Sequence, residues 1–366
     1  MIRFLVRVRP PAGHLALGGV HVDTCVGIVA NPASGRDIRR LVAGASVFGN
    51  ADKAGMVLRV LAGLGAAGVG RALMMPAFDG LWAALDRQLR AHAAAQRDHG
   101  AAPLPALEAL PMPLTGTGAD SVRAVELMRA AGAAAIVVLG GDGTHRVVAK
   151  ACGDVPLCAL STGTNNAFPE MREGTVAGLA TGLVARGRAG KGALRREAAL
   201  AVEAAGAEPD LALVDVVVSA ERFVGARALW RGAGVSELFV ACANPSSVGF
   251  SSVAGLLHPL PRGDGRALHV RLTDDPERAE LVLRVPLAPG LLAPVGVAGF
   301  RTLAPGETIA LAPAGGCLAL DGEREIERRP GEPVVVRLVR GPLTIDVDAV
   351  MRHAAHVQAT RLPPPS

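Results

Sequence analysis

Residues 137–146 read VVLGGDGTHR, and this stretch decides the fold. A continuous run of branched apolar residues leads into it, which predicts a strand buried on both faces, as in a parallel sheet. The run stops at two glycines, and the residues from Thr144 onward have the pattern of a helix. At such a helix start the backbone N–H groups point outward together and favour an anion.

The glycines of this loop predict contact with phosphates, because residues without side chains let a phosphate approach the backbone closely. Asp142 would repel a phosphate unless it binds Mg²⁺ or accepts a proton from an attacking hydroxyl. The alternative is that Asp142 caps a helix and that the glycines only make a turn. We assign phosphate binding to Gly140, Gly141, Gly143 and Thr144, and the catalytic role to Asp142.

Two more polar loops follow apolar runs. NPASGR (31–36) comes after a predicted strand that ends near Ala30, and its hydroxyl, glycine and cation suit a phosphate. An Asn-Pro turn capped by Ser34 is the alternative. LSTGTNNAFP (160–169) offers hydroxyls and amides that suit a ribose or a base edge, or else a polar turn that enters a helix. The candidates are Asn31, Ser34, Gly35 and Arg36 in the first loop, and Thr162, Gly163, Thr164, Asn165 and Asn166 in the second.

Strand and helix patterns alternate through the first part of the chain, which predicts an open, Rossmann-like parallel α/β sheet. Ligands bind such sheets beyond the carboxyl ends of the strands, where all three loops would lie. Short strand patterns with turn signals then predict an all-β antiparallel sandwich. We expect a nucleotide-binding domain over 1–170, a helical junction over 171–199, an all-β substrate or oligomerisation domain over 200–345, and a tail, 346–366, that returns to the first domain.

The late β region contains LALDGEREI, residues 318–326. The dipeptide Asp-Gly between alternating runs is first of all a hairpin signal. Asp321 and Glu323 are two residues apart, so on a strand they would share a face and be placed to contact a metal or an acceptor.

Composition narrows the function classes. The chain has 366 residues, a net charge of +5, no tyrosine and 3% aromatic residues, which argues against a base-stacking nucleic-acid platform. Its five cysteines form no C-x-x-C pair, so neither a zinc site nor a disulfide framework is indicated. Charged residues interrupt the N-terminal segment and prolines interrupt the apolar stretch 285–300, which predicts a cytoplasmic protein without stable membrane association.

The motifs GGDGT, NP-x-SG, GT-x-N and DGE together resemble the superfamily that joins NAD kinases with diacylglycerol and sphingosine kinases. Longer segments, among them GIVANPASGRDIRRLVA and STGTNNAFPEMREGTVAGLA, are more similar to the ATP-NAD kinase-like X proteins of acetoin catabolism. The resemblance implies ATP with Mg²⁺, a site between two domains, and transfer of the γ-phosphoryl group to a hydroxyl. It implies that Asp142 is the base, and that the chain forms a homo-oligomer.

Two departures from the family pattern concern the acceptor. NAD kinases carry an Asn-Glu pair in a strand like LNEVVI, whereas this chain has LVDVVV, with Val214 in place of the amide and Asp215 in place of the acid. Valine cannot hydrogen-bond a nucleotide, so NAD is in doubt as the acceptor, while Asp215 is a candidate contact to a metal or acceptor. His145 and Arg146 stand where the family usually has apolar residues: Arg146 would bind phosphate and His145 would assist proton transfer, or both form an exposed helix face.

Three functions follow from these patterns. The first is an NAD-kinase-like phosphotransferase that acts on a nucleotide such as NAD or on a small polyol. The second is a lipid kinase with an apolar cleft, for which residues 247–260 (SVGFSSVAGLLHPL) are a candidate lining. The third is a nucleotide-binding regulator without catalysis.

Overall fold

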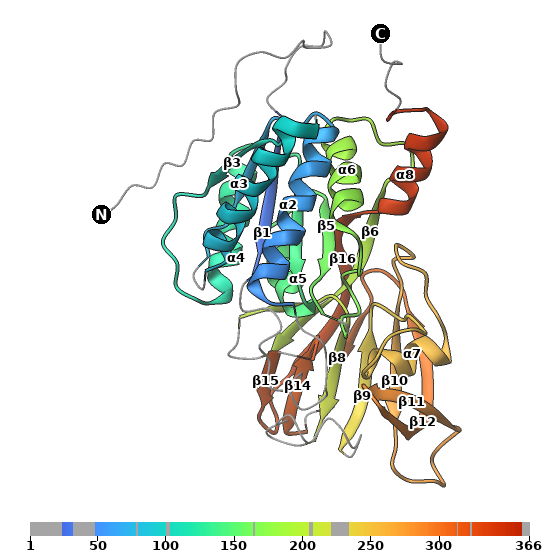
Figure 1. Ribbon diagram of the computed structural model, residues 1–366. Coiled ribbons are helices and arrows are strands. Elements are labelled where there is room, and N and C mark those ends of the chain that lie inside the picture. The colour runs from blue at the N-terminus through green and yellow to red at the C-terminus, as the bar shows by residue number, and fades with distance from the viewer. Residues whose placement is uncertain are drawn as a thin grey trace.

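The computed structural model describes most of the chain, and it has two β-sheets stacked end to end (Figure 1). Helices flank the first sheet, and the second sheet is antiparallel, so the expected fold class is confirmed. The described residues are 24–31, 48–77, 80–99, 103–163, 165–204, 208–220, 234–312, 314–322 and 324–360.

The first sheet has the strand order β3-β2-β1-β4-β5-β16-β6-β7, with β13 paired to β16. The pairs from β3 to β5 are parallel, and β5 pairs with β16 in parallel at a single position, whereas β6, β7 and β13 join antiparallel. Its strands are β1 (Cys25–Ala30), β2 (Arg71–Met74), β3 (Ala106–Ala109), β4 (Ala135–Gly140), β5 (Leu157–Ser161), β6 (Leu194–Ala204), β7 (Asp210–Ala212), β13 (Thr308–Ala310) and β16 (Val334–Ile345).

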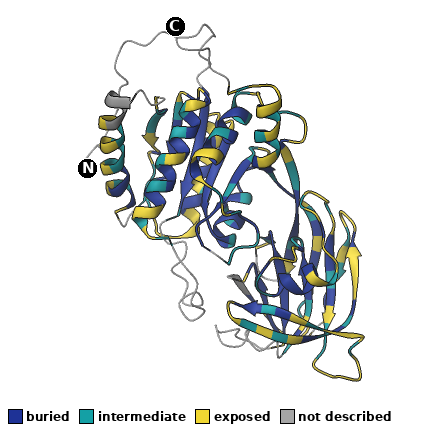
Figure 2. Ribbon diagram, turned by 45° about the vertical axis from the view of Figure 1, so that its right-hand side comes forward, coloured by how far each residue is buried: buried dark blue, intermediate teal, exposed yellow. Residues whose placement is uncertain are grey.

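Every residue of β1 and β4 is buried, as the apolar runs predict, because helices cover both faces of these strands (Figure 2). Alternate side chains enter two separate cores. Ile28 and Val137 pack with α2, α3, α6 and α8, while Val29 and Val138 pack with α4 and α5. The helices are α2 (Asn50–Ala66), α3 (Leu81–His99), α4 (Gly118–Ala130), α5 (Asp142–Ala149), α6 (Gly174–Ala185) and α8 (Val347–His356).

The second sheet has the strand order β11-β12-β10-β9-β8-β14-β15, and all its pairs are antiparallel. One face packs against α7 (Ser251–Leu257), and the other packs against the ends of β6 and β16 that extend beyond the helices. Its strands are β8 (Asp215–Ser219), β9 (Val235–Val240), β10 (Ala267–Leu272), β11 (Leu281–Ala288), β12 (Leu291–Leu303), β14 (Gly316–Leu320) and β15 (Arg324–Arg328).

The chain between the two sheets differs from the expected junction. Helix α6 packs closely on α2, where a Cβ on Gly178 would lie 2.2 Å from the carbonyl oxygen of Val60. Residues 194–196 already belong to β6, and the late strand β16 runs back beside it, so this long antiparallel pair of the first sheet packs against the second sheet. After β16, helix α8 packs beside α6.

Candidate phosphoryl-transfer site

The three polar loops begin at the same level of the first sheet. In the strand register Ala30 lies opposite Leu139, and Gly140 lies opposite Ser161. Two hydrogen bonds then join the loops: Asn31 Nδ2 donates to Thr144 Oγ1 over 3.1 Å, and the Thr162 N–H donates to the Gly140 carbonyl over 3.3 Å. The sheet therefore brings these loops together at one edge.

The glycine loop is a tight corner between β4 and α5. A Cβ on Gly140 would lie 2.5 Å from Thr144 Cβ, so a side chain at this position would collide with the first turn of the helix. Gly141 is the N-cap residue and supplies no side-chain hydrogen bond to the helix. The corner thus leaves the start of α5 without a side-chain cap.

Asp142 occupies the first turn of α5, but its carboxylate reaches across to the third loop. The Phe168 N–H donates to Asp142 Oδ1 over 2.8 Å, and the Ala167 N–H donates to both carboxylate oxygens over 3.1 Å. These bonds fix its position between two loops, an arrangement that the helix-cap alternative did not anticipate.

The third loop is held by its own polar groups. Asn166 Nδ2 donates to Ser161 Oγ over 2.6 Å and to the Gly163 carbonyl over 3.3 Å, while the Ser161 hydroxyl donates to the same carbonyl. The Asn166 amide, assigned from the sequence to ligand binding, here stabilises the turn. Thr162 is buried, and Asn165 is half-buried.

Two further aspartates approach Asp142 from the second sheet. Burial, with the nearby charge of Asp142, raises the pKa of Asp215 to about 7, against a hydrogen bond from the Ser251 backbone. Asp321 is equally buried, and burial raises its pKa well above the usual value. Its carboxylate accepts hydrogen bonds from the N–H groups of Leu213, Val214 and Asp215.

The turn that carries Asp321 confirms the hairpin signal and corrects the strand-face interpretation. Asp321 and Gly322 have φ values of 50° and 67°, in the three-residue hairpin loop between β14, which ends at Leu320, and β15, which begins at Arg324. Asp321 is therefore a turn residue, and not a strand residue, and it binds backbone amides.

Arg146, assigned from the sequence to phosphate binding, pairs with carboxylates in the structure. Its side chain is buried, with Nη1 3.3 Å from Asp210 Oδ1 on β7 and Nε 3.6 Å from Asp321 Oδ2 in the turn after β14. Lys150 also pairs with Asp210. These pairs tie α5 to β7 of the first sheet and to the turn after β14 of the second sheet.

His145 is fully buried, so the exposed helix face considered for His145 and Arg146 is wrong. Its Nδ1 lies 2.8 Å from the Gly141 carbonyl oxygen, and its ring lies 5.8 Å from the Phe168 ring. Burial lowers the pKa of His145 to about 4. The imidazole is thus neutral near pH 7, which argues against the expected assistance in proton transfer at neutral pH.

Five of the predicted site residues lie outside the described residues: Ser34, Gly35, Arg36, Thr164 and Glu323.

The sequence did not single out two cations near this edge. Lys53 on α2 is 1% exposed, and its ammonium donates to the Asn31 carbonyl over 3.0 Å. Arg262, in the loop after α7, donates to the Phe168 carbonyl over 2.9 Å, and its guanidinium lies 5.0 Å from the centre of the Phe168 ring. No local pattern marks either residue, because only the packing of distant segments brings them here.

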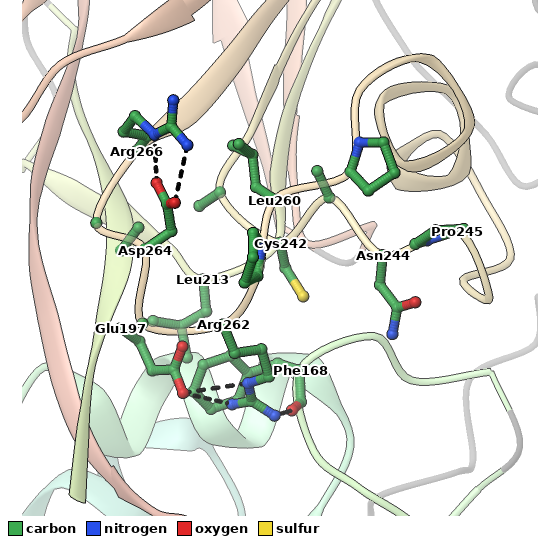
Figure 3. Close-up of a pocket in the computed structure, with 17 residues that line it drawn as sticks. Phe168, Glu197, Leu213, Cys242, Asn244, Pro245, Leu260, Arg262, Asp264 and Arg266 are labelled. Carbon is green, nitrogen blue, oxygen red and sulfur yellow. Dashed lines mark hydrogen bonds and ion pairs between the residues drawn. The ribbon is translucent and has the colours of Figure 1, made fainter. Parts of the chain in front are cut away.

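A cavity of about 310 Å³ has Phe168 in its wall (Figure 3). Segments from β6, from the loop after β9 and from the loop after α7 surround it. Arg262 crosses its floor, paired with Glu197 and bonded to the Phe168 carbonyl (Figure 3). The main side chains that line it are Phe168, Leu213, Cys242, Asn244, Leu260 and Arg262.

Comparison with known proteins identifies the family. Residues 26–189 match the ATP-NAD kinase N-terminal domain, and residues 198–341 match the acetoin catabolism protein X C-terminal domain. The chain is 45% identical to acetoin catabolism protein X of Cupriavidus necator over 361 residues, which covers 97% of this chain and 99% of that protein. The chain belongs to the acetoin catabolism protein X family. This member therefore combines an NAD kinase-like domain with the C-terminal domain of that family.

Two solved structures of a putative diacylglycerol kinase from Bacillus anthracis str. Sterne are also similar. Each covers 89% of this chain and 98% of its own, at 12% identity and a TM-score of 0.45. Within the described ranges, the helices of this family member lack the length and apolarity needed to span a membrane.

Proposed function

We propose that this acetoin catabolism protein X family member is an ATP-dependent phosphotransferase that moves the γ-phosphoryl group of ATP to a hydroxyl. The observation that carries the proposal is that Asn31, the glycine loop and the third loop meet at one sheet edge, where the third loop holds Asp142, within a chain that has an NAD kinase-like domain. Phosphoryl transfer depends mainly on positioning and on neutralising charge, and this edge is suited to both.

The glycine loop would receive the phosphates of ATP through backbone N–H groups, and Thr144 and Arg36 would add a hydroxyl and a cation. Lys53 supports this arrangement, because its buried ammonium brings positive charge to the end of β1. Asp142 would orient the acceptor hydroxyl and take its proton. Its bonds to Ala167 and Phe168 would fix the carboxylate in place before the acceptor binds.

Mg²⁺ would be shared between Asp142 and the phosphates. The described residues contain no group of three side chains arranged as metal ligands. The Asp142 carboxylate and the phosphates of ATP fit Mg²⁺ nevertheless, because the ion is often held by one or two carboxylates together with substrate phosphates. When bound, the ion supplies charge neutralisation on the phosphoryl group.

Release of ADP from ATP, measured with candidate acceptors, tests the proposal. The acceptors are NAD, NADH, glycerol, butane-2,3-diol, acetoin and diacylglycerol; acetoin is included because of the name of the related protein. We expect Asp142→Asn to keep ATP binding and to lower transfer by about 10²–10⁴-fold. Asp154→Asn, at an exposed aspartate just beyond α5, is the matched control.

Full activity of Asp142→Asn would refute the role of Asp142. Tight ATP binding without transfer to any acceptor would instead favour a non-catalytic regulator. Transfer to diacylglycerol in vesicles would favour a lipid kinase. Against this last function, residues 251–255 of the candidate lipid segment are buried in α7 and pack in a core rather than lining an open cleft.

A further inference from the structure

We propose that the cavity lined by Phe168 is an effector site: it binds a small uncharged compound that carries a carbonyl or hydroxyl oxygen, and the bound compound stabilises the loop that holds Asp142. Among the described residues that line the cavity, none belongs to the glycine loop, so its occupant does not itself receive the phosphoryl group. The inference rests on the proposed function and goes beyond it, because it names a second ligand and a way to regulate transfer.

Ala167 and Phe168 connect the acid to the cavity. Their N–H groups donate to the Asp142 carboxylate over 3.1 Å and 2.8 Å. Their carbonyl oxygens are held by two side chains that line the cavity. Cys242 Sγ donates to the Ala167 carbonyl over 3.5 Å, and Arg262 Nη1 donates to the Phe168 carbonyl over 2.9 Å. A change at the cavity wall therefore reaches the two amides that position Asp142.

The Phe168 ring gives the bound compound its leverage on the loop. The ring lines the cavity, and the Arg262 guanidinium lies 5.0 Å from the centre of the ring. A ligand shifts a conformational equilibrium only if it makes different contacts in the two states. A compound packed against Phe168 and Arg262 makes these contacts only while the loop is in the position that holds Asp142. Binding should therefore favour that position and activate transfer.

The charged side chains that line the cavity are paired and balanced in sign. Arg262 Nη2 lies 2.9 Å from Glu197 Oε1, and Arg266 donates to Asp264 through two nitrogens (Figure 3). A charged ligand would have to compete with these ion pairs, and it would also disturb the arginine that holds the Phe168 carbonyl. An uncharged ligand leaves the pairs intact, so the site selects uncharged compounds.

Asn244 supplies a polar group at an exposed position of the lining. Its Oδ1 accepts a hydrogen bond from the Ser246 N–H over 2.9 Å, so its amide nitrogen is the end that presents donors (Figure 3). Such donors match the oxygen of a carbonyl or a hydroxyl. Apolar side chains form the buried part of the lining: Ala198, Leu213, Ala243 and Leu260. The ligand should therefore have an apolar body and an oxygen at one end.

The size of the cavity limits the ligand further. A volume of about 310 Å³ is at the lower end for small-molecule pockets, which begin at about 300 Å³. A nucleotide, with its base, sugar and charged phosphates, matches neither this volume nor the balanced charge of the lining. The cavity therefore suits a compound of the size of a simple ketone or diol, and its ligand differs from the nucleotide expected at the glycine loop.

Binding to the full-length protein is measured by ligand-observed NMR, which detects weak complexes. The probes are butan-2-one and cyclohexanone, which have no hydroxyl and so cannot act as phosphoryl acceptors. Propionate, which is close in shape to butan-2-one but charged, is the matched control ligand. Two further measurements follow the coupling to Asp142: hydrogen exchange of the peptides that contain the Ala167 and Phe168 amides, and ADP release in the presence of an acceptor.

Three variants locate the site. Ala241→Leu adds volume at a half-buried position of the lining, and Ala293→Leu makes the same change at a half-buried position on β12 outside the lining. Asn244→Ala removes the donor at an exposed loop position, so the test stands even if Ala241→Leu fails to fold.

We expect at least one ketone to bind. Ala241→Leu should weaken its binding by about tenfold or more and Asn244→Ala by about fivefold, while Ala293→Leu leaves it unchanged. Saturation with the ketone should slow exchange of the Ala167 and Phe168 amides and raise the rate of ADP release by about fivefold or more.

Failure of both ketones to bind, or equal binding by the cavity variants and the wild type, would overturn the site. Propionate that binds as tightly as butan-2-one would overturn the uncharged class of ligand. If the bound ketone leaves amide exchange or ADP release as it was, the cavity does not regulate Asp142. Slowed exchange in a protein that releases no ADP with any acceptor would support the effector site and overturn the kinase function instead.

Discussion

The backbone N–H of Phe168 donates to the carboxylate of Asp142 over 2.8 Å, although 26 residues separate them in the chain. Through this bond the loop after β5 holds the acid that the loop after β4 supplies. Arg262, from the second sheet, in turn grips the Phe168 carbonyl and covers its ring. The position of Asp142 is thus set jointly by both sheets, and this dependence leads to the predictions below.

Arg262→Lys should destabilise the protein and loosen the loop that holds Asp142. Lysine cannot reproduce the bonds that the guanidinium makes at once to Phe168, Glu170 and Glu197. We expect a loss of about 1–3 kcal/mol in the free energy of unfolding, measured by urea denaturation. Arg266→Lys, at a more exposed pair with Asp264, should change it by less than about 1 kcal/mol. Equal losses in the two variants would contradict the special position of Arg262.

Gly140→Ala should disrupt the glycine corner, because its Cβ would lie 2.5 Å from Thr144 Cβ. Such overpacking typically costs about 1–3 kcal/mol, and we expect weaker ATP binding as well. The control is Gly118→Ala at the start of α4, where the added Cβ would lie 3.4 Å from a side-chain atom of Val147. Thermal unfolding and ATP titration of both variants check this; undiminished ATP binding by Gly140→Ala would argue against the corner as a phosphate site.

Asp321→Ala should be far more harmful than Asp321→Asn. Alanine leaves the N–H groups of Leu213 and Val214 without their acceptor and removes the partner of Arg146 in a buried region. We expect a loss of about 3–5 kcal/mol. Asparagine keeps one acceptor oxygen and tolerates the positive φ of 50°. The free energies of unfolding of the two variants, measured by urea denaturation, test this prediction. Similar values would show that the buried carboxylate does not stabilise the backbone N–H groups that it accepts from.

The raised pKa of Asp215 predicts that the protein loses stability as the pH rises. Its pKa in the folded protein is about 7 against an ordinary value of 3.8, so the folded state keeps a proton that the unfolded state releases. The free energy of unfolding should therefore fall between about pH 4 and pH 7, by an amount of the order of a few kcal/mol. Asp215→Asn should remove much of this slope, and Asp321, whose pKa is also raised, should account for part of the remainder.

The lowered pKa of His145 has the opposite effect on stability, over an overlapping range of pH. Because burial lowers its pKa from 6.5 to about 4, the unfolded state binds the proton first as the pH falls. The stability that neutral His145 contributes should thus be lost between about pH 6.5 and pH 4. His145→Gln should reduce this loss of stability at acid pH. Urea denaturation at a series of pH values separates the two effects. If His145→Gln loses as much stability at acid pH as the wild type, burial does not keep the ring neutral.

The sequence by itself determined the strands, the glycine corner and the late hairpin, because these depend on local properties. Branched apolar runs predict β1 and β4, and Asp-Gly predicts the turn after β14. Helix α4 also follows from local signals, with Thr117 as its cap and Gly132, at φ 76°, just beyond its end. The convergence of loops at the carboxyl edge could be predicted as well, since parallel strands share that edge.

Only the tertiary structure decided which way each polar side chain turns. Arg146 is adjacent to His145 in the chain, yet Arg146 pairs with Asp210 of the first sheet and Asp321 of the second, whereas His145 is buried against Phe168. Arg262 and Cys242 reach the loop that holds Asp142 because β6 and β16, long strands of the first sheet, pack against the second sheet and place the two sheets in contact. Local sequence fixes the strands and turns, whereas partners far apart in the chain determine burial, charge pairing and the cavity.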